Sequence, residues 1–569
     1  MVDPILLIAV PLAVAFLLPL FGRLGRPVAV TVHGATVLFV TAAAASWLPG
    51  LLDGSVTTVD VTTGGWAAPV GIGLSFGLPE AVLCALAGLT ALASLVALTP
   101  REDEETHGRS GLLQLLVLVG AIGLFMTRDL FNLFVFLEIS AIGTAAMVAF
   151  GREDRALEAG FKYMLIGAAA SAFLLIAIAF LYKLTGTLSL AEMPALAAAA
   201  PAAAMGIVLT FLLAGFAIEL KLIPVNGPAL DLYDGAEPAV MALVTGATVN
   251  GVLFAFFKVS ALFPDTWYGA MMVLGMLTFV GGNLLATMQD RPRRMLGYSS
   301  SAQIGLLVFL IPLVRAGTVP PLAAALLLIN HTLAKPALLW LAGAVKSRTL
   351  EGWTGAFSRG PARLLLVIAI LAITGLPPFP GFWGKWQALT GMAGGGMTGW
   401  IAVLLVGSLF EFICYYRWYR RVQEEASTET EATSSTSPAT RWTDLFGPAL
   451  FGIGATAIGL YFAHRMTGPA ETAVLITAAA GVVLVLLKRL PGGLLNMAAM
   501  GVIAVAATLL QRSGGLAPDT LSGLFGILVI VGGFVVILAG TSGHGGAKGP
   551  VPGLLLILIA SLLMLVRAE

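Results

Sequence analysis

Residues 211–228 read FLLAGFAIELKLIPVNGP, an apolar run that carries Glu219 and Lys221 just before a proline. Two further apolar stretches, LLLINHTLAKPALLWL (residues 326–341) and AITGLPPFPGFWGKWQAL (residues 372–389), also place a lysine close to a proline. A charged side chain at the centre of a bilayer costs about 2.5–3.5 kcal/mol on insertion scales. A helix that only anchors a protein has no use for such a charge. The three stretches therefore indicate a path for protons or ions, with each lysine beside a helix break.

The composition is that of a membrane protein. The chain has 569 residues, of which 58% are hydrophobic and 11% are charged, and its mean hydropathy is +0.95. Soluble domains carry about 25% charged residues. Apolar runs of about 20 residues, the length that crosses a bilayer, recur from end to end. We therefore expect an all-α polytopic membrane protein in the inner (plasma) membrane, surrounded by lipid.

The same composition argues against several other functions. A net charge of +1 offers no basic field for nucleic acid. The two cysteines, Cys84 and Cys414, are too few for a disulfide framework, a zinc cluster or an iron–sulfur site. The sequence also has no dinucleotide fingerprint and no phosphate loop. We expect no cofactor, no metal and no catalytic site within this chain.

Arginine and lysine are concentrated in alternate loops. Under the positive-inside rule, this asymmetry places the N-terminus outside. The loops assigned to the inside carry Arg23, Arg26, Arg101, Arg109, Arg152, Arg155, Arg291, Arg293, Arg294, Lys346, Arg348, Arg359, Arg363, Arg417, Arg420 and Arg421. The outside loop 52–78, rich in Thr, Val and Gly, predicts a short β-hairpin. The polar, Ser/Thr-rich stretch 421–443 predicts a disordered inside linker.

Glu138 is an ionisable residue near the middle of the apolar run DLFNLFVFLEISAIGTAAMV (residues 129–148). The protonation of a buried carboxyl group responds to neighbouring charges, so Glu138 is a candidate proton carrier. The alternative is a carboxylic acid that hydrogen-bonds a neighbouring helix.

Glu219 and Lys221 are two residues apart, so a regular helix would point them to nearly opposite sides. Pro224 frees a backbone acceptor beside Lys221, and the alternative for this lysine is that it reaches the inside face.

Three more positions complete the candidate path. His331 and Lys335 are four residues apart and share a helix face, and Pro336 frees a carbonyl on the same turn. Together they could pass a proton through water, although a lone histidine is more often structural. Lys385 follows three prolines, so its helix must be interrupted, and a relay or gate is expected there. Asn250 lies within a span, where interhelical hydrogen bonding would also explain it.

Seven segments resemble the antiporter-like subunits shared by respiratory complex I, Mrp-type cation/proton antiporters and group 4 membrane hydrogenases. They lie in order over about residues 60–390. The segments are GGWAAPVGIGL, DLFNLFVFLEIS, LEAGFKYMLIGAAAS, IPVNGPALDLYDGAEPAV, RRMLGYSSSAQIG, INHTLAKPALLWLAGAV and GLPPFPGFWGKW. The hairpin, the pair His331 and Lys335, and the GFWGK segment resemble the Mrp D-type subunit most, whereas DLYDGAEPAV is more similar to the complex I N-type subunit.

The resemblance implies about fourteen core helices in two inverted repeats, each with a broken helix. The apolar runs of the sequence predict about four additional C-terminal helices, which exceed the family's usual fourteen. The resemblance places Glu138 in a glutamate–lysine pair, His331 and Lys335 on a polar axis, and Lys385 at the terminal position. The implied parts are N-terminal helices (1–111), a first half-channel (112–263), a second half-channel (264–420), the linker (421–443) and C-terminal helices (444–569). In the resting state we expect Glu138 to be ionised and held by Lys221.

Two positions depart from the family pattern. Glu219 occupies the position that usually holds the helix-7 lysine, which is displaced here to Lys221, and Asn250 occupies the helix-8 lysine position. These changes could alter which cation is handled or weaken the first half-channel.

Three functions follow from the resemblance. The first is a proton-translocating subunit of an NADH-quinone oxidoreductase-like or hydrogenase-like complex. The second is a subunit of an Mrp-type Na⁺(K⁺)/H⁺ antiporter, and the third is a non-conducting docking subunit. All three imply other membrane subunits as partners, and the first two imply protons with or without Na⁺ or K⁺.

Overall fold

The computed structural model describes residues 1–467, apart from 67–70, 103, 151–152, 346, 358–359 and 424–440. Most of the predicted linker and the four predicted C-terminal spans lie outside the described residues.

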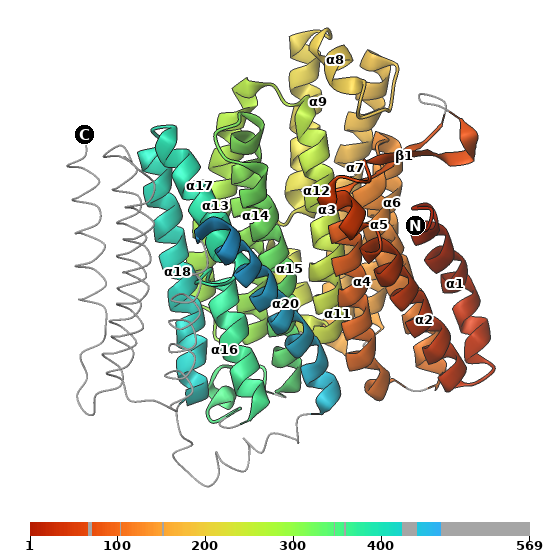
Figure 1. Ribbon diagram of the computed structural model, residues 1–569, viewed down its shortest axis with the longest axis vertical. Helices are drawn as coiled ribbons and strands as arrows, with labels where there is room; N and C mark the ends of the chain where they lie inside the picture. The colour runs from red at the N-terminus through yellow and green to blue at the C-terminus, as the bar shows by residue number, and fades with distance from the viewer. Residues whose placement is uncertain are drawn as a thin grey trace.

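Most of the described chain forms a bundle of apolar helices that run alternately in opposite directions (Figure 1). The N-terminal helices are α1 (Leu6–Gly22), α2 (Arg26–Ala45), α3 (Leu48–Asp53), α4 (Leu78–Leu98), α5 (Glu104–Met126), α6 (Leu130–Ala149) and α7 (Asp154–Thr185). The central helices are α8 (Met193–Ala198), α9 (Ala202–Glu219), α10 (Gly227–Gly235), α11 (Pro238–Leu243), α12 (Val249–Val259), α13 (Tyr268–Thr287) and α14 (Pro292–Arg315). The remaining helices are α15 (Pro321–Ala344), α16 (Pro361–Ile373), α17 (Pro380–Gly394), α18 (Thr398–Gln423) and α20 (Trp442–Thr467).

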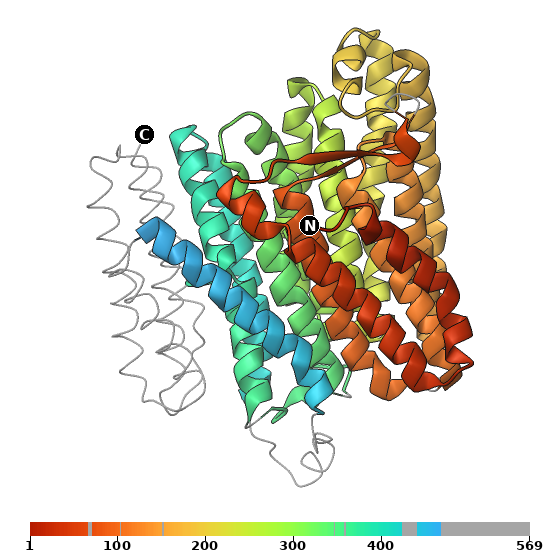
Figure 2. The same ribbon diagram turned by 45° about the vertical axis from the view of Figure 1, so that its right-hand side comes forward.

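Among the described residues, twelve helical segments are long and apolar enough to cross a membrane. The shorter apolar helices α1 and α16 bring the crossing segments of the described chain to fourteen, as the resemblance implied. α16 is continued across the bundle by α17. The last described helix, α20, lies obliquely over α15, α16 and α17 and also reaches α4 (Figure 2). The predicted all-α polytopic fold is confirmed.

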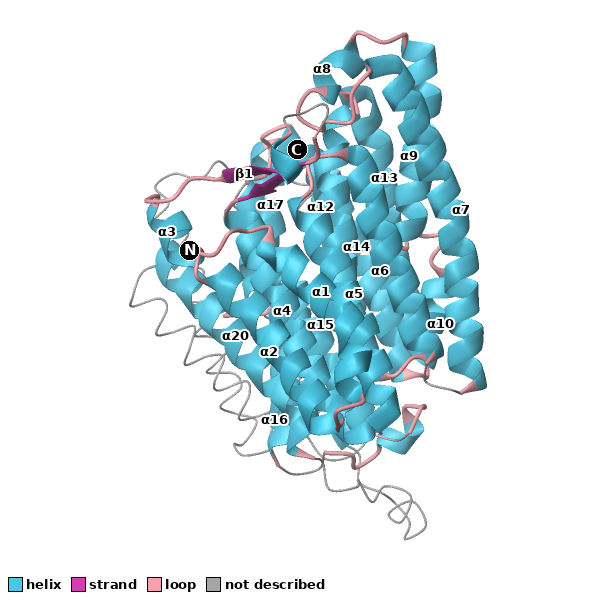
Figure 3. Cartoon of the chain, turned by 90° about the vertical axis from the view of Figure 1, so that its right-hand side faces the viewer, coloured by secondary structure: helices cyan, strands magenta, loops and turns pink. Residues whose placement is uncertain are grey.

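The two ends of the bundle differ in structure. At one end, the strands β1 (Val59–Thr62) and β2 (Gly73–Phe76) pair antiparallel, with Val59 opposite Phe76. This pairing confirms the predicted hairpin in loop 52–78, and α8 lies at the same end (Figure 3). The opposite end holds α10 and the start of α16. We call it the arginine-rich end, after Arg26, Arg101, Arg155, Arg291 and Arg294.

α13 and α14 cross so closely that only glycine fits at the contact. A Cβ on Gly275 would lie 2.5 Å from the backbone nitrogen of Phe309, and one on Gly305 would lie 2.6 Å from the carbonyl oxygen of Gly275. Small residues at helix contacts let backbones approach and gain packing where lipid supplies no hydrophobic drive. This crossing brings α14, which carries polar side chains of the site, against the rest of the second half.

We predict that Gly275→Ala lowers the midpoint of thermal unfolding of the purified complex, because overpacking a close contact costs about 1–3 kcal/mol. Gly269→Ala on the same helix is the matched control, since a Cβ there meets no atom within 4 Å. The control should unfold at or slightly above the native midpoint. Equal midpoints for the two variants would contradict the close crossing.

Candidate ion-relay site

Two helix breaks place two of the lysines predicted from the sequence. α9 ends at Glu219 and α10 begins at Gly227, so residues 220–226 are not helical. α16 ends at Ile373 and α17 begins at Pro380. Irregular backbone at membrane depth persists where protein surrounds it or where it lines a cavity. The breaks expected beside Lys221 and Lys385 are therefore present.

Lys335 does not lie beside a break, contrary to our expectation. α15 continues from Pro321 to Ala344 with Pro336 inside it. A proline within a transmembrane helix can be accommodated when neighbouring helices and side chains satisfy the freed backbone groups. Lys335 is therefore held by a continuous buried helix, with 0% of its surface exposed.

Three ionisable residues from other segments of the first half lie against one stripe of α7. Tyr163, Gly167 and Ser171 are four residues apart in turn, so they share a helix face. Lys221 Nζ lies 5.9 Å from the ring centroid of Tyr163. A Cβ on Gly167 would lie 4.0 Å from Glu219 Oε1.

Glu138 completes the row, because it accepts a hydrogen bond from the Ser171 hydroxyl. The order along α7 is therefore Lys221, Glu219 and Glu138, with steps of about 6 Å at 1.5 Å of rise per residue. Glu138 is only half-buried in this chain.

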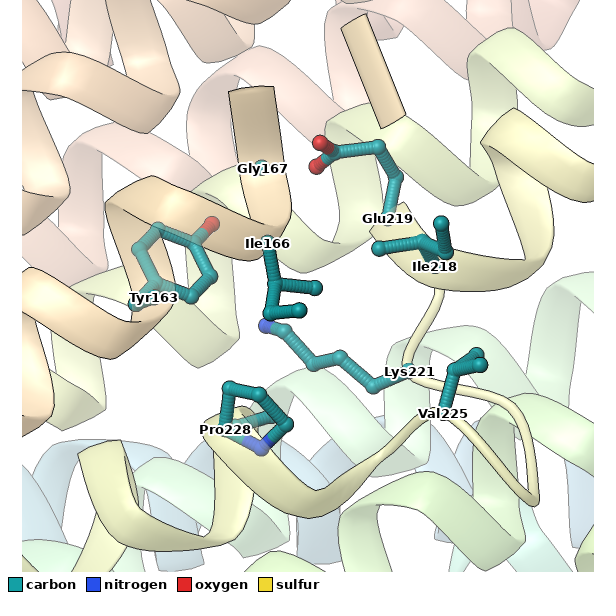
Figure 4. Close-up of a pocket in the computed structure, with 9 residues that line it drawn as sticks. Tyr163, Ile166, Gly167, Ile218, Glu219, Lys221, Val225 and Pro228 are labelled. Carbon is teal, nitrogen blue, oxygen red and sulfur yellow. The ribbon is translucent and has the colours of Figure 1, made fainter. Parts of the chain in front are cut away.

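Glu219 and Lys221 line the same small cavity rather than opposite sides of a helix. Figure 4 shows the Glu219 carboxylate beside Gly167, while Lys221 extends between Ile166 and Pro228 towards Tyr163. The sequence-based prediction assumed a regular helix, but the helix ends at Glu219. Lys221 then adopts a left-handed backbone with φ of 59°. This conformation costs a residue other than glycine about 1–3 kcal/mol.

The expected pairing of Glu138 with Lys221 is not present. Within the described residues, no carboxylate lies within the 4.0 Å of an ion pair with Lys221 Nζ. Glu219 stands between the two groups on the α7 stripe. The displacement of the lysine by two positions thus replaces a direct pair with a row of three ionisable groups.

Asn250 lies two residues after an irregular helical turn. Residues 244–248 form a π-helical turn, η3, between α11 and α12. The Asn250 side chain donates to the carbonyl of Gly246 and to the Thr332 hydroxyl of α15, both at 2.8 Å. π-turns are frequent at functional sites. The sequence did not predict this turn, because glycine and threonine in an apolar run are compatible with a regular helix.

A hydroxyl pair links the first half to this turn. Ser140 Oγ, two residues after Glu138 on α6, lies 2.8 Å from Thr248 Oγ1 of η3. Tyr233 Oη of α10 bonds Thr245 Oγ1 at 2.7 Å and Ser300 Oγ of α14 at 2.8 Å. η3 is therefore hydrogen-bonded to the first half, and Tyr233 connects it to Ser300 of the second half.

His331 and Lys335 share one face of α15, as predicted. Lys335 Nζ donates to Ser299 Oγ at 2.7 Å and to Tyr415 Oη at 2.9 Å. Both ring nitrogens of His331 are buried without a protein partner. Buried polar groups of this kind are usually satisfied by ordered water. Ordered water beside His331 would therefore satisfy its two ring nitrogens.

Lys385 forms a buried ion pair with a residue that the sequence analysis missed. Its Nζ lies 2.7 Å from Glu411 Oε2 on α18, and the two residues are 8% and 0% exposed. The chain makes room for the lysine at Gly375, whose φ is 74° and where a Cβ would lie 3.2 Å from Lys385 Cδ. Lys385 Nζ also lies 3.3 Å from the free carbonyl of Thr374 at the break.

The two lysines of the second half are joined by a ladder of polar side chains. Ser299 and Gln303 lie one turn apart on α14, and Tyr415 and Glu411 lie one turn apart on α18. Lys335 binds the first rung, Ser299 and Tyr415. The second rung holds Lys385, because Glu411 accepts from the Gln303 amide as well. Glu411 could have been found from its position in the span GSLFEFICYY by the argument that selected Glu138.

One further buried lysine has a structural role. Lys258 Nζ donates to the carbonyls of Leu124, Phe125 and Thr127 at 2.6–3.0 Å. These acceptors lie at the end of α5, where helix carbonyls have no partners within the helix. Lys258 therefore caps α5 and leaves no donor over for transport.

The comparisons with known proteins identify the family of this chain. The family described as "NADH:quinone oxidoreductase/Mrp antiporter, TM" matches residues 127–411, half of the chain. NADH-quinone oxidoreductase subunit N of Desulforudis audaxviator is 31% identical over 492 residues, which cover 80% of this chain and 95% of that protein. The chain belongs to this family of membrane subunits.

Solved structures share the fold. A chain of the archaeal membrane-bound sulfane sulfur reductase matches with a TM-score of 0.72 and 26% identity, covering 80% of this chain and 94% of that one. A chain of the Mrp complex from Dietzia sp. matches with a TM-score of 0.71, covering 80% of this chain and 93% of that one. At 22% identity the second match shows the fold alone. This chain is thus an antiporter-like, multi-pass membrane subunit similar to subunits of multisubunit complexes.

We predict that Glu411→Leu destabilises the protein by about 3–5 kcal/mol, because it leaves the Lys385 ammonium buried and unpaired. The double variant Lys385→Met/Glu411→Leu should recover most of this loss, since apolar side chains of similar volume can replace a buried pair. Thermal unfolding of the purified complex measures both effects, with the exposed Glu351→Leu as control. A single variant as stable as the native protein would contradict a charged pair at this site.

Proposed function

We propose that this chain translocates protons as a subunit of a larger membrane complex, through the row on α7, the turn at Asn250 and the ladder that joins Lys335 to Lys385. The observation that carries the proposal is the buried Lys385–Glu411 pair at the break between α16 and α17. An ion pair inside a membrane protein is expensive, and ionisable residues at that depth mark ion paths.

Competition for Glu411 can move a proton along the ladder. A proton that arrives at Lys335 creates a second cation one helical turn from Glu411, through Tyr415. A cation 4 Å from a carboxylate gains about 4 kcal/mol at an effective dielectric constant of 20. Moving one charge across 100 mV costs about 2.3 kcal/mol. When Glu411 is attracted towards Lys335, Lys385 loses its ion pair. The energy of that ion pair exceeds the cost of moving the charge, so Lys385 can release its proton.

In the first half, Glu219 takes the central place on the α7 stripe. We propose that Glu138 and Glu219 share a proton and that Lys221 sets which of them is ionised, because two neighbouring carboxylates rarely ionise together without a cation. Glu138 is only half-buried in this chain, so a partner subunit that packs against it can alter its charge. The predicted first half-channel (112–263) would thus exchange its proton through a partner.

A redox-driven complex is our first choice for the assembly. The similarity to an oxidoreductase subunit N extends over most of both chains. The electrons in such an assembly move in other subunits, and this chain contributes the proton path. With the N-terminus outside, as the loop charges predict, the arginine-rich end faces the inside.

A second candidate is cation/proton antiport in an Mrp-type assembly. The carboxylates of Glu138 and Glu219, neighbours in the α7 row, favour it, because hard cations take carboxylate oxygens as ligands. Partners that copurify in mild detergent separate the two candidates: iron–sulfur or flavin subunits support the first, and small membrane subunits alone support the second. An assembled complex in which this chain moves neither protons nor Na⁺ or K⁺ would support the docking role.

We predict that Lys385→Ala lowers proton translocation by the intact complex in vesicles at least about tenfold, since about 1.4 kcal/mol added to a barrier slows a step by that factor. A pH-sensitive dye inside the vesicles reports the flux. The control is Lys183→Ala, which removes an exposed lysine at the end of α7. Native flux in Lys385→Ala, with the complex assembled, would overturn the proposal.

We predict a similar loss for Glu138→Gln, because glutamine keeps the hydrogen bond from Ser171 but cannot be ionised. Ser171→Ala removes only the hydrogen bond and should reduce the flux less. If Glu138→Gln pumps normally while Lys385→Ala does not, the second half works alone and the α7 row is not part of the path.

A further inference from the structure

Two buried histidines lie outside the relay described above. His33 of α2 and His107 in the first turn of α5 have ring centroids 5.8 Å apart. They are 0% and 1% exposed. Glu102 precedes α5, and its Oε2 lies 2.8 Å from His107 Nδ1. The Glu102 side chain is 11% exposed. The three residues therefore lead from the arginine-rich end into the bundle.

The histidines have free hydrogen-bonding nitrogens. Both ring nitrogens of His33 and Nε2 of His107 are buried without a protein partner. Packing alone would favour an apolar side chain here, because an unsatisfied buried polar group costs about 1–3 kcal/mol. Gly111 of α5 provides the space, since a Cβ there would lie 2.9 Å from His33 Nδ1. The site thus suits water molecules between the two rings.

Two arginines at the same end of the bundle are engaged with other groups. Arg26 at the start of α2 donates to the Thr99 carbonyl. Arg101 forms ion pairs with Asp444 at 2.7 Å and Glu237 at 3.6 Å. Among these groups, Glu102 is therefore the carboxylate that faces the histidines.

Polar groups continue inward from His33. Gln114 lies three residues beyond Gly111 on α5 and donates to the Ala91 carbonyl of α4 at 2.9 Å. On α4, the Ser94 hydroxyl is buried without a protein partner. The Thr90 hydroxyl would lie 2.7 Å from a Cβ on Gly246, so α4 contacts η3 there.

The carbonyl of Gly246 is the acceptor that Asn250 uses. The row therefore ends at the turn that joins the two halves of the relay. At 1.5 Å of rise per residue, His33 lies about 10 Å from the start of α2 and Asn250 about 18 Å from the start of α11. The polar groups thus deepen in order from the arginine-rich end.

We propose that Glu102, His107 and His33 form a proton inlet that supplies the central axis at Asn250 from the arginine-rich end. Asn250 cannot exchange a proton itself, so the axis needs a titratable donor at this level. Protonated Glu102 gives its proton to His107 Nδ1, and His107 releases the Nε2 proton to water. The water passes a proton to His33, and each transfer breaks one O–H or N–H bond and forms another. This inlet rests on the proposed function of the chain as a proton carrier.

Glutamine variants test the inlet, because glutamine can hydrogen-bond but cannot carry a proton at neutral pH. We expect His33→Gln and His107→Gln each to lower proton translocation by the reconstituted complex about tenfold. Thermal unfolding and subunit content should stay native. The control is His464→Gln, at an exposed position on α20. Native flux in both inlet variants would overturn the inlet.

Chemical rescue distinguishes transport from packing. In His33→Ala, added imidazole should restore flux, whereas pyrrole, a ring of similar size without a basic nitrogen, should not. Equal rescue by both rings would overturn the inlet in favour of a packing role. Lys385→Ala serves as the reference variant. Native flux in Lys385→Ala refutes the proposed function itself. Blocked flux in Lys385→Ala together with native flux in the histidine variants refutes only the inlet.

Discussion

The cost of a charge inside a bilayer governs the arrangement of this protein. Lys385 and Glu411 lie 2.7 Å apart and are almost fully buried. Each would be strongly unfavourable alone, so the helices that carry them, α17 and α18, must remain packed together. The break at residues 374–379 brings the lysine and a free carbonyl to the same place. The hydroxyl and amide groups of α14 and α18 then connect this pair to Lys335.

The two halves of the protein solve the same problem differently. The second half holds a compact ion pair with a polar ladder beside it. The first half spreads its charges along α7, with Glu219 between Lys221 and Glu138. A row of three groups has more ways to place a proton than a pair does.

Irregular helix geometry marks the places where polar groups meet. α9 ends beside Lys221, α16 ends beside Lys385, and η3 lies beside Asn250. At each of these places a backbone carbonyl or a small residue becomes available to a polar side chain. Lys335 shows that a regular helix can also hold a buried lysine when neighbouring helices supply the partners. The N-terminal histidines extend this polar interior to the arginine-rich end.

The sequence alone determined the membrane class, the hairpin, the breaks beside Lys221 and Lys385, and the face shared by His331 and Lys335. These features depend on composition, prolines and helical periodicity, which are local. Only the tertiary structure decided the partners of the charges. Glu411 pairs with Lys385 across 26 residues of chain, and Glu219 separates Glu138 from Lys221 because α6, the end of α9 and the break after it converge on α7. The energy of a buried charge depends on what surrounds it in space, and that information is not contained in any single segment.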